Sequence, residues 1–305
     1  MTDSTAPYPQ GPGPGFGGLP PDLAALESAR ALILPVPYDG TTSYVPGARR
    51  GPQAILTASQ NMELYDEELE ASPCEVGIAT LPELDISDAG PAATVARVEE
   101  AARWALGRGS FLVTLGGEHS LTPPAVRAAR ERWPDLSVLQ IDAHADLRDT
   151  YRGTPFSHAC AMRRVREICP AVQLGIRSLS AEEADWVREQ GLELGYGGVR
   201  RDPAVWARLL GGLSRHVYVT VDLDGLDPSV CPGVGTPEPG GLGWQETLGI
   251  LRRVFSEREV VAADVMELCP LPGDPRSEFL AARLVYKLIG YRFCLPPRGA
   301  APAPA

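Results

Sequence analysis

The sequence contains very little lysine and no long apolar run. Lys287 is the only lysine, so nearly all of the positive charge comes from arginine, and the formal net charge of the 305 residues is −11. Such an acidic chain does not offer the phosphate-neutralising surface that nucleic-acid binding requires. No stretch approaches the roughly 18 consecutive apolar residues of a transmembrane helix, and no basic segment precedes an apolar one at the N-terminus. We therefore expect no nucleic-acid partner, no membrane span and no signal peptide.

Cysteine and histidine are also scarce. The six cysteines show no Cys-x-x-Cys spacing, which argues against a structural zinc site and against a disulfide framework. Scattered thiols suit a reducing compartment, so the expected location is the cytoplasm. Only four histidines occur, and two of them, His119 and His144, stand beside acidic residues in short polar segments. These two histidines are the first candidates for a functional role.

Proline and glycine concentrate at the two ends of the chain. Residues 1–22 are predicted to form a flexible tail rich in these residues, and residues 296–305 a second tail. Between them lies one expected folded domain, residues 23–295. The hydrophobic content of 44% is enough for a substantial core in a domain of this size.

Apolar runs of strand length alternate with helical stretches through this domain. The expected strands are 31–36, 75–80, 111–115, 136–141, 172–176, 192–194, 217–221 and 260–265. The expected helices are 52–62, 91–107, 122–132, 157–167, 181–190, 203–213, 245–256 and 277–289. This alternation predicts a single-domain α/β fold in three αβα layers, with a doubly wound, mostly parallel sheet of about eight strands.

Metal-capable side chains follow three of the expected strands. They are His119 after 111–115, Asp142, His144 and Asp146 after 136–141, and Asp222 and Asp224 after 217–221. A single Asp at a strand end is usually a turn former or a helix cap. Three such clusters at the carboxyl ends of strands instead indicate a shared site, because open α/β sheets bind ligands there. Oxygen and imidazole ligands without thiolate favour Mn²⁺, Mg²⁺ or Fe²⁺, and six ligands can hold two ions.

Several motifs in register resemble those of the ureohydrolases, the arginase and agmatinase enzymes. The matching segments are Tyr38–Gly47, Gly116–Ser120, Asp142–Asp146, Asp222–Pro228, Pro232–Gly241 and Asp264–Glu267. They appear in the family's order and span roughly residues 30–293. The resemblance is nearest to agmatinase, and it implies an arginase-like fold.

The resemblance also implies a set of metal ligands. One Mn²⁺ would be held by His119, Asp142, Asp146 and Asp222. A second would be held by Asp142, His144, Asp222 and Asp224. A hydroxide bridging these two ions would attack the guanidinium carbon of the substrate. Relatives of this kind form homo-oligomers, so a trimer or hexamer is expected.

Three residues take catalytic roles by the same resemblance. Asp146 would accept the nucleophile's proton, and Glu267 would bind the substrate guanidinium. Many relatives have a proton-shuttling histidine where this chain has Arg152, so the nearby His158 becomes the candidate for the shuttle and for substrate contact. His216 precedes its strand and is predicted to be structural.

The substrate is less tightly specified than the metal site. Arg148 stands where arginases commonly have an Asn that grips the amino-acid head group, which favours agmatine, with putrescine and urea as products. Guanidinobutyrase and arginase activities remain alternatives, since Arg148 could meet a carboxylate. From other classes, a catalytically silent metal-binding paralogue and a dinuclear phosphoesterase also remain open. Glu118 and Glu238 are expected to support the site without ligating metal.

Overall fold

Eight strands build one parallel sheet in the computed structural model, which describes residues 15–86 and 90–295. The strands are β1 Ala31–Pro35, β2 Ile78–Thr80, β3 Phe111–Leu115, β4 Ser137–Ile141, β5 Ala171–Ile176, β6 Gly195–Tyr196, β7 His216–Asp222 and β8 Glu259–Met266. They lie in the order β2-β1-β3-β8-β7-β4-β5-β6, and every pair is parallel. The residues of β1, β3 and β4 are all buried, as expected for parallel strands covered on both faces.

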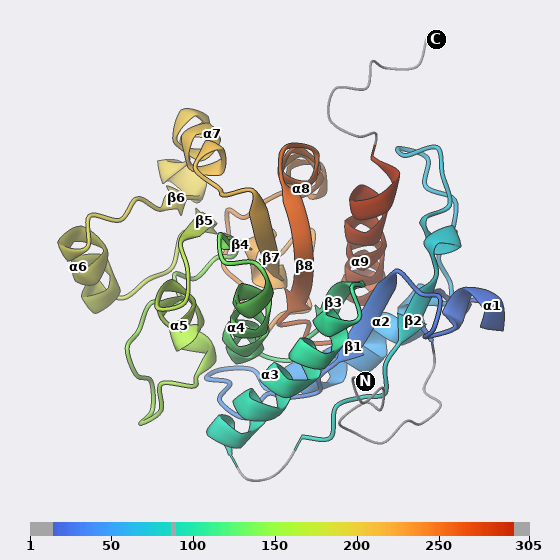
Figure 1. The fold of residues 1–305 in the computed structure, drawn as a ribbon. Coiled ribbons are helices and arrows are strands. Elements are labelled where there is room, and N and C mark those ends of the chain that lie inside the picture. The colour runs from blue at the N-terminus through green and yellow to red at the C-terminus, as the bar shows by residue number, and fades with distance from the viewer. Residues whose placement is uncertain (1–14, 87–89, 296–305) are drawn as a thin grey trace.

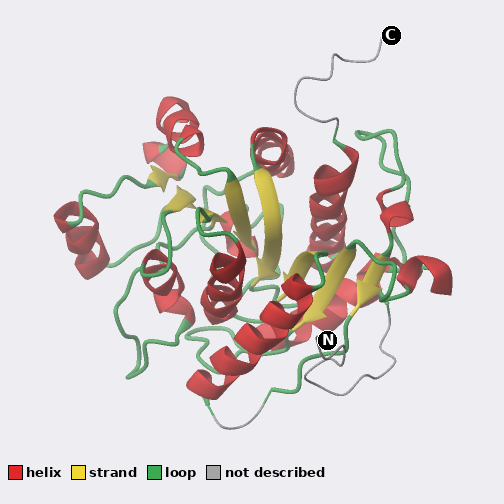
Figure 2. Ribbon diagram, in the orientation of Figure 1, coloured by secondary structure: helices red, strands yellow, loops and turns green. Residues whose placement is uncertain are grey.

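Helices cover both faces of this sheet, giving the three layers that the sequence predicts (Figure 1; Figure 2). The helices are α1 Pro21–Ala24, α2 Gly51–Ser59, α3 Pro91–Gly107, α4 Thr122–Arg132, α5 Ala161–Arg166, α6 Ala181–Glu189, α7 Pro203–Gly211, α8 Trp244–Glu257 and α9 Arg276–Cys294. One hydrophobic core joins the sheet to α2, α7, α8 and α9. A second core on the opposite face joins it to α3, α4, α5 and α6. The predicted α/β fold class is thus confirmed.

Two expected strands and one expected helix are placed wrongly by the sequence. The first part of the run 75–80 belongs to the 3₁₀ helix Pro73–Val76, and Gly77, with a φ of 78°, separates that helix from β2. The expected strand 192–194 precedes β6, whose two residues pair with Leu174 and Ile176 of β5 on either side of a register shift. The expected helix 157–167 begins instead as the 3₁₀ helix His158–Cys160 and continues as α5. Short apolar runs without period lead to such errors.

The packed part of the chain begins earlier than the expected boundary at residue 23. Phe16 is buried, packs against the ring of Tyr286 at a centroid distance of 6.4 Å, and its backbone N–H donates to Thr80 Oγ1 at 2.8 Å. The expected tail at residues 296–305 and the first 14 residues of the other tail lie outside the described residues.

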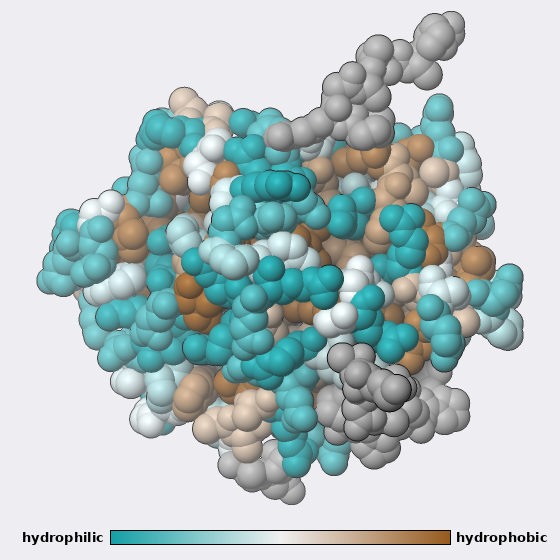
Figure 3. Space-filling view, in the orientation of Figure 1, coloured by the Kyte–Doolittle hydropathy of each residue, from teal (hydrophilic) through white to brown (hydrophobic). Residues whose placement is uncertain are grey.

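Hydrophilic residues predominate on the face seen in Figure 3, which includes α3 and α4. On this face Arg103 of α3 pairs with Glu131 of α4, at 2.8 Å between the guanidinium and carboxylate. Among the described helices, none combines the length and apolar composition that a membrane span requires.

Candidate metal centre and active site

The metal-ligand candidates all lie at the carboxyl edge of the central strands. His119 opens a 3₁₀ helix after β3, Asp142 directly follows β4, and Asp222 ends β7. β8 lies between β3 and β7, so these four strands are neighbours in the sheet. Segments that are far apart in the sequence therefore meet at one edge, where parallel α/β sheets place their ligand sites.

The Nδ1 atom of His119 faces three carboxylate oxygens. The distances are 3.0 Å to Asp142 Oδ2, 3.1 Å to Asp146 Oδ2 and 3.2 Å to Asp222 Oδ2. All four residues are buried, and Nδ1 has no partner in hydrogen-bond geometry among the described residues. A buried ring nitrogen aimed among three carboxylates is an arrangement that a cation would complete.

A second group of ligands adjoins the first through Asp142. His144 Nδ1 lies 2.9 Å from Asp224 Oδ2 and 3.7 Å from Asp142 Oδ1. Backbone N–H groups hold these carboxylates: Ala143 donates to Asp224 at 3.1 Å, and Asp224 donates to Asp222 at 2.9 Å. Asp142 thus belongs to both groups, in the position of a shared ligand.

The electrostatics of the cluster also favour a bound cation. Burial raises the pKa of Asp142 to about 8, and the charges of Asp224 and Asp146 act in the same direction. Burial and the charges of Asp224 and Asp142 raise the pKa of Asp222 well above its usual value. Burial opposes protonation of His144, but the charge and hydrogen bond of Asp224 outweigh it and raise the pKa of His144 to about 11. Divalent cations would relieve this crowding of buried anions.

The donor set fits manganese. The two clusters of potential ligands among the described residues contain only carboxylate oxygens and imidazole nitrogens, without cysteine. Such ligands suit Mn²⁺, Mg²⁺ or Fe²⁺ better than a structural zinc ion. All six ligand candidates predicted from the sequence lie in these two groups or contact them directly.

Glu267 lies beside the first ligand group, which contains His119. It follows β8, and its Oε1 accepts a hydrogen bond of 2.8 Å from the backbone N–H of His119. Its φ of 64° is left-handed, a conformation that costs about 1–2 kcal/mol in a residue with a side chain and that concentrates at functional sites. Burial and the charge of Glu118 raise its pKa well above the usual value, so a neighbouring cation would favour the carboxylate.

His158 lines the same cavity as Glu267. Its Nε2 lies 3.2 Å from Ser43 Oγ and its Nδ1 lies 3.3 Å from Thr41 Oγ1. Burial lowers the pKa of His158; Asp146 opposes this shift, while the charges of His144 and His119 reinforce it. A neutral imidazole that faces the cavity can accept a proton at physiological pH.

A cavity of about 260 Å³ joins these elements. Its lining residues include His119, His144, Asp146, His158, Asp222, Asp224 and Glu267. Arg148 also lines it, with its guanidinium 5.0 Å from the centroid of the Tyr151 ring and its Nε 4.0 Å from Glu183 Oε2. Arg152 instead donates to the backbone carbonyl of Ser43 at 3.1 Å, so it fixes the loop that carries a partner of His158.

The remaining candidates have supporting positions. Glu118 is fully buried, and its carboxylate accepts hydrogen bonds from Thr41 and Ser120. The Oε1 of Glu238 lies 4.0 Å from His144 Nε2, at the edge of the second ligand group. His216 lies at the amino end of β7, remote from the cluster, where its Nδ1 is 2.6 Å from Asp135 Oδ1.

A column of hydroxyls beneath His119 was not predicted from the sequence. His119 Nε2 lies 2.9 Å from Thr220 Oγ1, which lies 3.3 Å from Thr122 Oγ1. Thr122 and Tyr218 both donate to Asp264 Oδ2 at 2.8 Å. This column favours the tautomer that leaves Nδ1 free to bind metal. A polar residue inside an otherwise apolar strand, such as Thr220, is the sequence signal that marks it.

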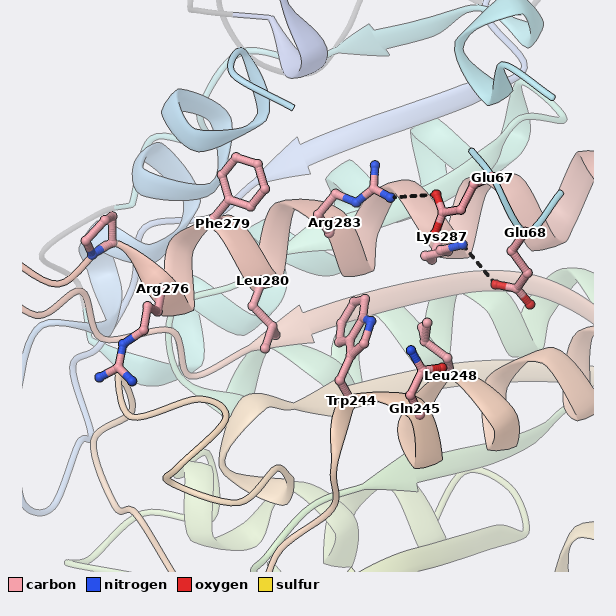
Figure 4. Close-up of a pocket in the computed structure, with 11 residues that line it drawn as sticks. Glu67, Glu68, Trp244, Gln245, Leu248, Arg276, Phe279, Leu280, Arg283 and Lys287 are labelled. Carbon is pink, nitrogen blue, oxygen red and sulfur yellow. Dashed lines mark hydrogen bonds and ion pairs between the residues drawn. The ribbon is translucent and has the colours of Figure 1, made fainter. Parts of the chain in front are cut away.

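A larger hollow of about 650 Å³ lies between α8 and α9, apart from the metal residues (Figure 4). Trp244, Phe279 and Leu280 give it apolar walls. Four of its charged groups pair with one another: Arg283 lies 3.4 Å from Glu67, and Lys287 lies 2.8 Å from Glu68. Neither potential metal cluster of the described residues lies in it, so the candidate chemistry stays at the sheet edge.

Comparison with known proteins agrees with this location. The sequence model of the Arginase family matches residues 29–290. The N(1)-aminopropylagmatine ureohydrolase of Synechocystis sp. is 42% identical over 278 residues, covering 88% of this chain and 91% of that protein. The agmatinase of Pyrococcus horikoshii is 34% identical and covers 87% and 93%. The crystal structure of the agmatine ureohydrolase of Thermoplasma volcanium superimposes with a TM-score of 0.81 at 30% identity, covering 89% and 93%. The family match includes every metal-ligand candidate.

Proposed function

This chain belongs to the arginase family, and we propose that it is a binuclear manganese ureohydrolase that releases urea from a guanidino amine. The observation that carries the proposal is the buried Nδ1 of His119, surrounded by three carboxylate oxygens and adjoined by Glu267. When bound, two Mn²⁺ ions supply Lewis acidity, which makes water nucleophilic at neutral pH.

The protein's own residues would orient the substrate and move protons. Glu267 would bind the planar guanidinium cation, because a buried carboxylate gains from a bidentate cationic partner. Asp146 lines the cavity and would accept the proton released by the attacking water. His158, held by Thr41 and Ser43, would take up a proton as the neutral imidazole and pass it to the leaving nitrogen. The amine then departs protonated, and urea is the second product.

Agmatine is the first candidate substrate, and N1-aminopropylagmatine is the second. Agmatine fits a cavity in which eight of the seventeen lining residues are acidic or histidine, and Arg148 is the one arginine or lysine among the described residues that line it. The second candidate is favoured by the higher identity of relatives named for it, 42% and 43%, against 34% for the agmatinase of Pyrococcus horikoshii. Both compounds carry the same guanidinium group.

Urea release from a substrate panel tests this proposal. Purified chain reconstituted with Mn²⁺ should release urea from agmatine or N1-aminopropylagmatine much faster than from arginine or guanidinobutyrate. Release from none of the four would contradict the ureohydrolase proposal, and a preference for arginine or guanidinobutyrate would contradict the guanidino-amine assignment. The expected homo-oligomer stays a prediction that light scattering can check.

A further inference from the structure

Two buried glutamines lie beneath the metal ligands in neighbouring strands. Gln140 of β4 and Gln173 of β5 are both fully buried, and they are direct register partners in the parallel ladder. Side chains alternate between the faces of a strand, so Gln140 points to the same face as a residue two positions on. That residue is Asp142, the ligand common to both metal groups. Polar side chains at 0% exposure need partners, and these two have them.

Arg166 fixes the direction of the hydrogen bonds in this pair. Its Nε and NH2 groups lie 3.1 and 3.0 Å from Gln173 Oε1. A guanidinium can only donate, so the atom facing it must be the amide oxygen, which removes the usual ambiguity of a glutamine amide. Gln173 Nε2 then donates to Gln140 Oε1 at 2.6 Å and to the carbonyl of Ala145 at 2.8 Å. Gln140 is left with its Nε2 to donate to Asp142 Oδ2 at 2.5 Å.

The donor at the end of this chain holds one oxygen of Asp142. The other oxygen, Oδ1, accepts from the backbone N–H of His144 at 2.6 Å. With a donor on each oxygen, the carboxylate plane cannot rotate freely. The backbone beneath it is equally tight, since a Cβ on Gly175, whose φ is 94°, would lie 2.8 Å from the carbonyl oxygen of Asp142. A carboxylate shared by two cations must keep both oxygens aimed, so orientation matters more here than at a terminal ligand.

We propose that Arg166, Gln173 and Gln140 form a relay that positions Asp142 for metal binding. The proposal rests on the proposed binuclear centre. None of the three residues lines the cavity or belongs to either ligand group, so they are positioning residues that act through Asp142. Arg166, at the outer end of the relay, is the last residue of α5 and is half-buried. It can therefore be substituted with little disturbance of the core.

Isothermal titration with Mn²⁺ alone tests the relay in the full-length apoprotein. Gln140→Met keeps length but removes the donor, and it should weaken Mn²⁺ binding by about tenfold to a hundredfold, the usual cost of losing an outer partner of a ligand. Arg166→Met frees the Gln173 amide to flip and should weaken binding by about tenfold. Arg166→Lys should recover most of that loss, because an ammonium also only donates. Gln190→Met makes the same change at an exposed residue and should leave the affinity unchanged.

The same variants separate positioning from a general loss of structure. Electron paramagnetic resonance should show the coupled spectrum of paired Mn²⁺ ions in the wild type and more isolated Mn²⁺ in Gln140→Met. Urea denaturation then reports whether each variant is folded. If Gln140→Met unfolds, the comparison of Arg166→Met with Arg166→Lys tests the positioning role of the relay instead. Unchanged affinity in Gln140→Met, or equal losses in Arg166→Met and Arg166→Lys, would overturn the relay alone. A wild-type chain that binds no Mn²⁺ would instead overturn the metal centre.

Discussion

Replacing Glu267 by Gln separates substrate orientation from metal binding. The amide keeps the size of the side chain and can still accept the 2.8 Å hydrogen bond from the His119 backbone, but it cannot match the charge of a guanidinium. Removing one partner of a buried charge pair costs about 2–5 kcal/mol. At about 1.4 kcal/mol for each factor of ten, kcat/KM for agmatine should fall by about 30-fold to about 5000-fold.

Glu267→Gln should not destabilise the metal-free fold. Burial raises the pKa of Glu267 above its unfolded value, so at neutral pH the folded state bears the cost of either a buried charge or an added proton. Glutamine removes that cost, and the free energy of unfolding of the metal-free chain at pH 7 should stay level or rise. Because Glu267 is outside both ligand groups, bound manganese should not change.

Steady-state urea release, elemental analysis and urea denaturation together check this prediction. Glu182→Gln, the same change at an exposed residue of α6, is the matched control and should behave as wild type. A Glu267→Gln variant with near-normal kcat/KM would refute the orienting role. A variant that lost manganese would instead show that Glu267 supports the metal site.

Three further predictions concern the ligands, the proton shuttle and the substrate. Asp222→Ala removes a carboxylate 3.2 Å from His119 Nδ1, so it should abolish tight manganese binding and urea release. Normal turnover by this variant would contradict the assignment of Asp222 as a metal ligand. Burial lowers the pKa of His158, so wild-type activity should be present above that pKa and lost as the pH falls through it. His158→Asn should lower turnover, retain metal and lack this acidic limb of the pH–rate profile. An unchanged pH–rate profile in this variant would refute the shuttle. When the two substrates compete, kcat/KM for agmatine should exceed that for arginine by at least about a hundredfold, because the α-carboxylate of arginine loses its hydration on binding. Comparable rates would show that Arg148 pairs with this carboxylate.

The parts of the site that the sequence predicts are local in the chain. His119, Asp142 and Asp222 each follow an apolar run at once, so the strand end and the ligand are read from one short segment. Strand and helix alternation then places these ends on one edge of a parallel sheet. The same reasoning predicts the three layers, which the structure confirms.

The parts that the sequence does not predict depend on pairing between distant segments. Gln140 supports Asp142 only because β4 and β5 pair with Gln140 opposite Gln173, and that register is a property of the assembled sheet. Phe16 lies in a segment of Gly and Pro that composition alone makes a tail, yet a distant helix, α9, gives it a buried contact with Tyr286. The short edge strand β6 is defined by its partner β5 more than by its own residues.

The dependence of urea release on bound manganese tests the central claim most directly. Metal-free chain would be titrated with Mn²⁺ while urea release from agmatine and from N1-aminopropylagmatine is followed beside the amount of bound metal. The account predicts that activity with at least one of these substrates rises to a plateau at two tightly bound ions per chain. A plateau at one ion per chain, or full binding of two ions without urea from either substrate, would contradict it.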